Sequence, residues 1–166
     1  MSVTTSLSTA HQAILLAAMD RIIPEDEYPS ASQNGVAEYF ARQLVGDLRD
    51  YLPTLAAGLE SIDCDARIMF GAGFAELDSA QQDGLLIGIE AGTLVAEWPM
   101  DSALFFRRLV ELIAEGYYAD PENNFGNPNK ASWTMIGFVE RLGGTCDRAM
   151  KPPRPPMLGE QEKGGL

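Results

Sequence analysis

Few side chains in this sequence have the type and spacing that catalysis needs. The one histidine, His11, has no Glu-x-x-His or His-Glu-x-x-His pattern around it, so the signatures of di-iron and zinc-protease sites are absent. There is no Gly-x-Ser-x-Gly nucleophile elbow and no Cys-x-x-Cys-His haem attachment sequence. We therefore expect no catalytic, cofactor-binding or metal-binding residue in this chain, and we expect His11 to lie at the surface.

One short segment matches part of a dinucleotide-binding loop. Gly71–Glu76, GAGFAE, supplies the first two glycines of such a loop, but it follows a helical pattern and has Glu76 in place of the third glycine. Phosphate binding requires a strand, a tight turn and a helix N-terminus in succession. The segment is interpreted as a flexible helix end.

A second segment has the spacing of a calcium-binding loop. Asp120, Glu122 and Asn124 occupy its first, third and fifth positions. However, Phe125 stands where such a loop needs glycine, and Ala131 stands where it needs a bidentate glutamate. We interpret this segment as a turn-rich loop whose polar side chains bond to its own backbone.

The sequence is strongly acidic. Its 166 residues include 24 acids against 12 bases, for a net charge of -12. Such a surface repels phosphate groups, which argues against nucleic acid and anionic membranes as partners. The acidic run Glu25–Glu27 is interpreted as a solvated loop. Cys64 and Cys146 leave two interpretations open: two free or buried thiols, or a disulfide that holds the C-terminal segment to the helical body.

The elements that must position these residues are helices. Apolar residues recur every three to four positions, and alternation with a period of two never persists. The sequence predicts an all-α fold: a compact bundle of about five helices in one domain, residues 1–150, with a long ordered C-terminal loop and an extended proline-rich tail, residues 151–166. The predicted helices cover about 9–23, 34–50, 53–70, 79–94 and 101–118.

Capping signals and inward faces refine these helices. Thr9 with Gln12 and Ser79 with Gln82 have the spacing of capping boxes. The residues expected to face inward are Val36, Phe40, Leu44, Val45, Leu48, Leu55, Leu59, Ile62, Ala66, Met69, Phe70, Leu85, Leu86, Ile89, Leu94, Leu104, Phe105, Leu109, Leu112 and Ile113.

Three glycines follow one another every four residues in the fourth predicted helix. Gly84, Gly88 and Gly92 each cost up to about 1 kcal/mol of helix propensity relative to alanine, so a packing reason is expected. They would leave a flat stripe on which another helix could approach closely.

The segment Gly116–Phe138, GYYADPENNFGNPNKASWTMIGF, is too aromatic for an ordinary linker. Because it also lacks a catalytic group, we interpret it as an ordered loop that packs against a partner protein, where aromatic side chains dominate binding energy. Trp133 could be such a contact or part of the core. The predicted interface residues are Tyr117, Tyr118, Phe125, Asn127, Trp133 and Phe138, and in the tail Pro152, Pro153, Arg154, Pro155 and Pro156.

The tail is too poor in apolar residues to form a core of its own. Its prolines favour a stiff polyproline II conformation, which lowers the entropy lost on docking. We expect it to lie along a partner, with Lys151 and Arg154 facing acids there.

Localisation is predicted from what the sequence lacks. No apolar run approaches the roughly 20 residues that span a bilayer, so no membrane insertion is expected. The N-terminus has no basic region before its apolar stretch, and the only adjacent arginines, Arg107 and Arg108, lie deep in the chain. A cytoplasmic location is therefore expected, with the periplasm as the alternative if a leader has been removed.

A set of short motifs, in a particular order, resembles the gluconate 2-dehydrogenase subunit 3 family, the small or gamma subunits of sugar dehydrogenases. The resemblance covers about residues 15–138. The matching segments are Leu16–Pro24 (LAAMDRIIP), Phe70–Phe74 (FGAGF), Ser79–Gln82 (SAQQ), Phe105-Phe106, Gly116–Pro121 (GYYADP), Gly126-Asn127 and Trp133–Gly137 (WTMIG).

The resemblance implies a non-catalytic helical subunit. Such subunits accompany a large FAD-containing subunit of the glucose-methanol-choline oxidoreductase family and support its folding or export. Family members commonly carry a twin-arginine signal, which this sequence lacks. Some family complexes add a multi-haem cytochrome subunit, and the sequence leaves open whether this one does. The alternative is a stand-alone helical adaptor for another protein.

Overall fold

A computed structural model describes residues 7–122 and 131–136 of the chain. In the described residues the regular structure is helical, without a strand, and five helices of eight or more residues dominate, which confirms the predicted all-α fold. The elements in chain order are α1 (Thr9–Ile22), α2 (Val36–Gln43), the 3₁₀ helix η1 (Arg49–Tyr51), α3 (Leu52–Phe70), the 3₁₀ helix η2 (Phe74–Glu76), α4 (Ser79–Ala91), α5 (Ser102–Ala114), the π-helical turn η3 (Glu115–Ala119) and α7 (Ala131–Met135).

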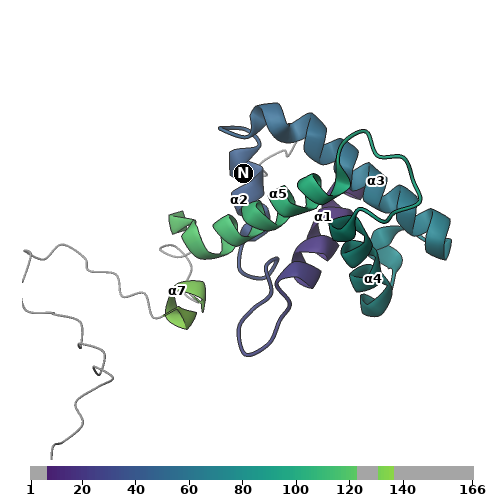
Figure 1. The fold of residues 1–166 in the computed structure, drawn as a ribbon. Coiled ribbons are helices and arrows are strands. Elements are labelled where there is room, and N and C mark those ends of the chain that lie inside the picture. Colours follow the sequence, from purple (N-terminus) through teal and green to yellow (C-terminus); the bar gives the residue numbers. More distant parts are fainter. Residues whose placement is uncertain (1–6, 123–130, 137–166) are drawn as a thin grey trace, which may run out of the picture.

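The helix α1 is the centre of the bundle. It contacts α3, α4, α5 and η2, and Figure 1 shows α5 crossing the molecule in front of it. Ala18 and Met19 of α1 are fully buried, with Ile14 and Leu15 one turn earlier. Burying each large apolar side chain contributes about 1.5–3 kcal/mol. The apolar face of α1 therefore holds together three helices, α3, α4 and α5, that come at least 30 residues after it in the sequence.

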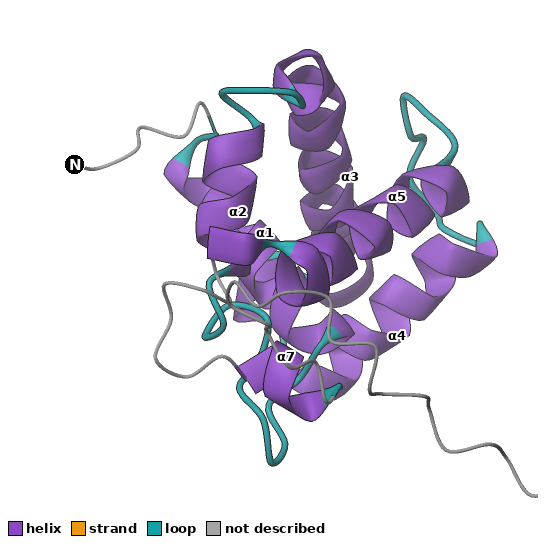
Figure 2. Cartoon of the chain, turned by 90° about the vertical axis from the view of Figure 1, so that its left-hand side faces the viewer, coloured by secondary structure: helices purple, strands orange, loops and turns teal. Residues whose placement is uncertain are grey.

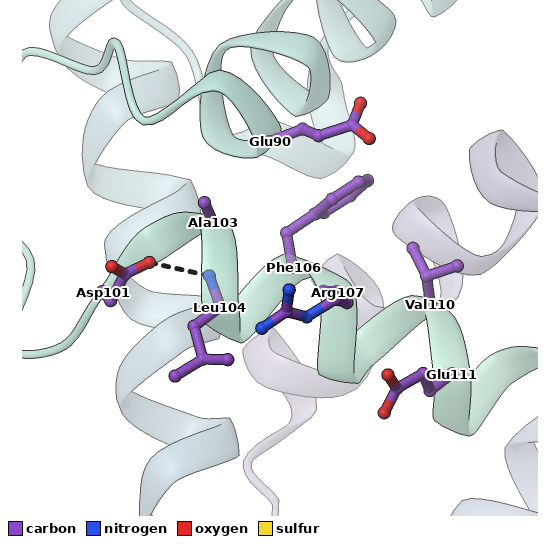
Figure 3. A pocket seen from close by; sticks show the side chains of 8 residues that line it. All are labelled: Glu90, Asp101, Ala103, Leu104, Phe106, Arg107, Val110 and Glu111. Carbon is purple, nitrogen blue, oxygen red and sulfur yellow. Dashed lines mark hydrogen bonds between the residues drawn. The ribbon is translucent and has the colours of Figure 1, made fainter.

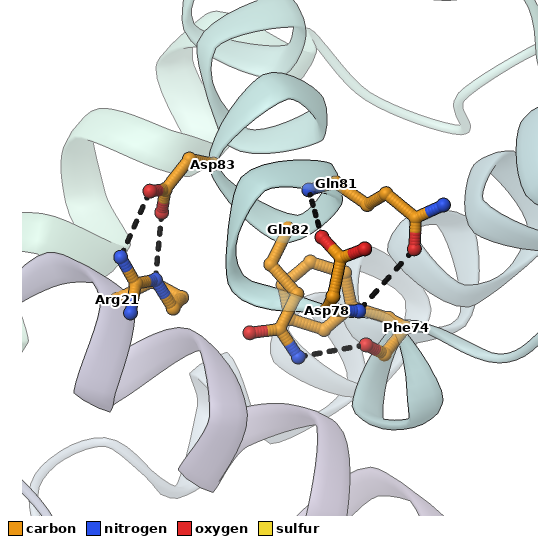
Figure 4. A network of polar contacts seen from close by, with 6 residues as sticks. All are labelled: Arg21, Phe74, Asp78, Gln81, Gln82 and Asp83. Atoms are coloured by element: carbon orange, nitrogen blue, oxygen red, sulfur yellow. Dashed lines mark hydrogen bonds and ion pairs between the residues drawn. The ribbon is translucent and has the colours of Figure 1, made fainter.

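Side-chain caps fix where α1 and α4 begin, each one residue before the predicted cap. The hydroxyl of Ser8 accepts the N–H of His11 at 3.1 Å, so Ser8 and not Thr9 caps α1. Asp78 caps α4 through the N–H of Gln81 at 2.9 Å, and Gln81 accepts the N–H of Asp78 in return (Figure 4). Asp78 can do so because its backbone is extended, which leaves its carboxylate beside the free amides of the first turn.

Two predicted helices are shorter than expected. The second ends at Gln43 instead of residue 50, and residues 44–48 form turns that lead into η1. The fourth ends at Ala91 because Gly92 adopts a left-handed conformation with φ 64°, so Leu94 lies beyond it. Glycine is preferred at such a helix end because it has no Cβ to clash.

Four residues expected to face inward are exposed in the structure. They are Val45 in the turn after α2, Met69 and Phe70 in the last turn of α3, and Leu104 in the first turn of α5. The other apolar residues expected inside are buried or pack against the core, which explains why the bundle forms despite these exceptions.

The helices α3 and α5 approach each other closely at Gly58. A Cβ atom at this position would lie 2.1 Å from the ring of Phe105. Phe105 is itself buried and packs against Trp98, with ring centroids 5.7 Å apart. Glycine at position 58 thus makes room for the aromatic pair that closes this end of the bundle.

A second close approach joins α2 to η3. A Cβ atom at Gly116 would lie 2.7 Å from the ring of Tyr39. Next to it, Tyr117 is fully buried, and its hydroxyl donates to the carbonyl oxygen of Pro29 at 2.8 Å. The π-helical turn therefore carries residues that pack this chain's own core.

Candidate functional site

The predicted aromatic interface is only partly described. Tyr117 belongs to this chain's own core and is not part of its surface. Its side chain is buried, and its hydroxyl group donates a hydrogen bond to the carbonyl oxygen of Pro29. Tyr118 and Trp133 are half-buried, and the indole N–H of Trp133 donates to the carbonyl oxygen of Tyr118 at 2.9 Å. This bond fastens α7 to η3. The remaining predicted interface residues, Phe125, Asn127, Phe138, Pro152, Pro153, Arg154, Pro155 and Pro156, lie outside the described residues.

The two loop-like motifs carry carboxylates that already have protein partners. Asp120 and Glu122 both pair with the guanidinium of Arg42, at 3.2 Å for Glu122. In the glycine segment, the carboxylate of Glu76 accepts the N–H of Gly73 at 3.0 Å. A carboxylate on these amides repels a phosphate, and Gly71 ends a helix, so the geometry does not fit a dinucleotide.

The remaining candidates for chemistry are scattered. His11 lies 3.1 Å from the carboxylate of Glu60, on the outer side of the bundle. Cys64 is exposed on α3, and its predicted relation to Cys146 stays untested because residue 146 lies outside the described part of the chain. Within residues 7–122 and 131–136, no group of acids, cysteines and histidine could hold a metal ion, and no helix is long and apolar enough to cross a membrane.

A groove runs along the outside of α5, beside α4. We call it the α4–α5 groove and define it by six lining residues: Ile87, Glu90, Leu104, Phe106, Arg107 and Val110. It consists of two adjoining hollows of about 560 Å³ and 360 Å³, which share Glu90, Phe106 and Val110. Figure 3 shows Phe106 pointing from α5 towards the last turn of α4, where Glu90 lies.

An ion pair closes one end of the groove. Arg21 of α1 donates two parallel hydrogen bonds to Asp83 of α4, at 2.7 Å and 2.8 Å (Figure 4). These bonds lower the pKa of Asp83, so the carboxylate stays ionised at neutral pH, and the stability that it contributes is lost only as pH falls through the lowered pKa. Because both groups are partly exposed, the pair contributes only about 0.5 kcal/mol, but it fixes the wall of the groove.

None of the three glycines of the stripe predicted on α4 lines this groove. A Cβ atom at Gly84 would meet nothing within 4 Å, whereas one at Gly88 would lie 3.1 Å from Leu94. Gly92 ends the helix. No helix of the described chain packs on the stripe, so its predicted packing partner is not found there.

Sequence reasoning missed the groove. Phe106 and Val110 are one turn apart and continue the apolar pattern of α5, so they resemble core residues. Ile87 is the better signal, because it lies off the stripe formed by the buried residues Leu85, Leu86 and Ile89 and is 64% exposed. One exposed isoleucine is ordinary, but next to Phe106 and Val110 it extends a contiguous apolar surface, which is the kind that marks interaction sites.

The comparisons with known proteins give one match. The family model described as "Gluconate 2-dehydrogenase subunit 3" matches residues 9–140, which include all the helices described above. No curated protein and no solved structure matches the chain.

Proposed function

Because the chain belongs to the gluconate 2-dehydrogenase subunit 3 family, we propose that it is the non-catalytic small subunit of a flavin-dependent sugar dehydrogenase. In this proposal it supports the folding and stability of a large subunit that holds FAD and carries out the oxidation. The family name makes a multi-subunit complex the expected context. The role in folding and the flavin are our inference.

One contrast carries the proposal: polar side chains of this chain serve its own structure, whereas several large apolar side chains lie at its surface. Its histidine and several of its acids are engaged in structural contacts, as the His11–Glu60 contact and the Arg42 cluster show. By contrast, Phe106 and Val110 line an open groove, and Ile87 and Leu104 beside them are largely exposed. A surface of this kind is typical of a chain that works by binding another protein.

The FAD of such a complex would belong to the large subunit. A dinucleotide needs free backbone amides at a helix N-terminus, whereas the amides of Gly73 and Phe74 are bonded to the carboxylates of Glu76 and Asp63. The described residues offer no alternative glycine-rich turn after a strand. We therefore assign this chain no part in flavin binding.

Co-expression tests the proposal. The genes neighbouring that of this chain are searched for a large flavoprotein, which is then produced with and without this chain, and the soluble, flavin-containing large subunit is measured by flavin absorbance. We expect a yellow complex containing both chains, and insoluble or flavin-free large subunit when this chain is omitted. A large subunit that folds, retains FAD and oxidises sugar equally well alone would refute the supporting role. Sugar oxidation by this chain alone would refute its non-catalytic character.

A further inference from the structure

The floor and rim of the α4–α5 groove differ in chemistry. Phe106 and Val110 are half-buried and form an apolar floor between the two helices. Glu90 on α4 and Arg107 on α5 stand at the rim and are both exposed. Figure 3 shows the Glu90 carboxylate on the α4 side and the Arg107 guanidinium on the α5 side of the Phe106 ring. Two further acids, Asp101 and Glu111, line the larger hollow, so an occupant would meet an apolar floor whose rim is mainly acidic.

Within the part of the chain that the structure describes, these two rim charges lack ionic partners. Neither Glu90 nor Arg107 forms an ion pair with residues 7–122 or 131–136, whereas the neighbouring Arg108 and Glu111 pair with each other at 3.1 Å. Unpaired charges beside an apolar floor favour a partner that carries an apolar side chain flanked by opposite charges. Such complementary charges fix the position of the partner on the groove.

We propose that the α4–α5 groove is the docking site for the large subunit. Its occupant is a segment that inserts an apolar side chain against Phe106 and Val110 and places a lysine or arginine opposite Glu90, with an acid opposite Arg107. The excess of acids in the whole chain, with a net charge of -12, favours a basic character for the surrounding partner surface. This inference rests on the proposed function, because it names the surface that the proposed partner uses.

A matched pair of isoleucine substitutions tests the site. Ile87 on α4 is 64% exposed and lines the groove, while Ile68 on α3 is 55% exposed and lines neither hollow. Ile87→Arg should weaken binding of the large subunit about tenfold or more, because a charge replaces a buried apolar contact in the complex. Ile68→Arg should bind as the unaltered chain does. Both variants of the isolated chain should melt as the unaltered chain does, because both side chains are exposed.

Charge reversal tests the proposed occupant. Glu90→Lys should weaken the complex several-fold at low ionic strength and less at high ionic strength, because it removes an attraction and adds a repulsion. The large subunit is co-expressed with each of four chains: the unaltered chain, Ile87→Arg, Ile68→Arg and Glu90→Lys. The dissociation constant of each purified complex is then measured from its dissociation on dilution. If Glu90→Lys tightens binding, the basic occupant is wrong.

The outcomes separate this inference from the proposed function. If the unaltered chain binds no flavoprotein, the proposed function fails and the docking site fails with it. If all variants bind normally, or if only Ile68→Arg binds weakly, a complex exists but the docking site is elsewhere. If Ile87→Arg turns a dimer of the isolated chain into a monomer, a second copy covers the groove. If Ile87→Arg lowers the melting temperature of the isolated chain, other residues of the same chain cover the groove. Each of these last two results would overturn the proposal.

Discussion

Asp65 holds the loop between α4 and α5 to the rest of the bundle. Its carboxylate is fully buried and accepts the backbone N–H of Ala96 at 2.9 Å and the indole N–H of Trp98 at 2.7 Å. Through Trp98, which packs on Phe105, this one acid sets the position of the first turn of α5. It thereby helps to shape the end of the groove at which Leu104 lies.

We expect Asp65→Ala to destabilise the isolated chain by about 1–3 kcal/mol, because it leaves two partly buried donors without their acceptor. Equilibrium unfolding in urea measures this change. Asp65→Asn is the matched control, because its amide oxygen can still accept one of the two bonds, and it should lose less. If Asp65→Ala unfolded at the same urea concentration as the unaltered chain, the bonds to Ala96 and Trp98 would not contribute to stability.

Tyr39 makes stability depend on pH at the alkaline end. Burial, together with the nearby carboxylate of Glu115, raises the pKa of Tyr39 to about 12. In the unfolded chain the phenol ionises at its ordinary pKa of about 10. The neutral phenol is therefore favoured by folding, and its contribution to stability is fully present below pH 10 and is lost as pH rises through about 12.

We expect Tyr39→Phe to lose less stability than the unaltered chain between about pH 10 and about pH 12, because phenylalanine has no proton to release. Urea unfolding at a series of pH values measures it. Part of the alkaline loss should remain, since burial also raises the pKa of Tyr117. Identical alkaline profiles for the two chains would show that Tyr39 does not couple to folding.

At the scale of elements, two glycines in different helices have opposite surroundings. Gly58 of α3 faces the ring of Phe105, and Gly84 of α4 faces open space. We expect Gly58→Ala to destabilise the chain by about 1–3 kcal/mol, because the buried ring must move. Gly84→Ala should stabilise the isolated chain by up to about 1 kcal/mol, because alanine is the better helix former.

Thermal unfolding of the two glycine variants measures both effects. Each variant is the control for the other, since the same methyl group is added to a helix in both. A lower melting temperature for Gly84→Ala would mean that residues outside the described part of the chain cover this face of α4. An unchanged melting temperature for Gly58→Ala would mean that α3 and α5 can separate without cost.

The helices themselves were largely predictable from the sequence, because their starts depend on local chemistry. The extended Asp78 before α4, Pro53 in the first turn of α3 and Asp101 before α5 all act within a few residues of the chain. The sequence was less informative about where helices end and about which face of each helix is buried. The second helix stops early, at Gln43, and local apolar spacing cannot reveal that end.

The groove was not predictable for a related reason. Leu104 and Phe106 follow the same helical spacing as the buried residues of α5, yet Leu104 is 54% exposed. Which side of α5 is covered depends on where α4 packs, and that contact joins residues distant in the sequence. Conversely, Tyr117 was predicted at the surface because it lies in an aromatic segment, but the small residue Gly116 lets it enter the core.

At the scale of the whole molecule, the described helices form a bundle with the α4–α5 groove on its surface, in a chain of net charge -12. In Figure 2 the helices α4 and α5 lie together on one side of the bundle, and α2 lies on another. The core of the described residues is continuous across all of these helices, so the groove is already formed by packed helices before a partner binds. Preorganisation of this kind lowers the entropy lost on binding, which suits a subunit that is proposed to stabilise another protein.

Net charge governs how this molecule meets its partner. With 24 acids and 12 bases, the chain attracts a basic surface from a distance of about one Debye length, roughly 30 Å at 0.01 M salt and 8 Å at 0.15 M. We expect the association rate constant with the large subunit to fall at least about tenfold between these two salt concentrations, because steering is screened.

The dissociation rate constant should change much less, because it depends mainly on the close apolar contacts that salt does not screen. The fluorescence relaxation of the co-produced complex after rapid dilution, recorded at several final concentrations, measures both rate constants. An association rate that stays constant or rises with salt would mean that the partner surface is neutral or acidic, and the basic occupant proposed for the α4–α5 groove would then be wrong.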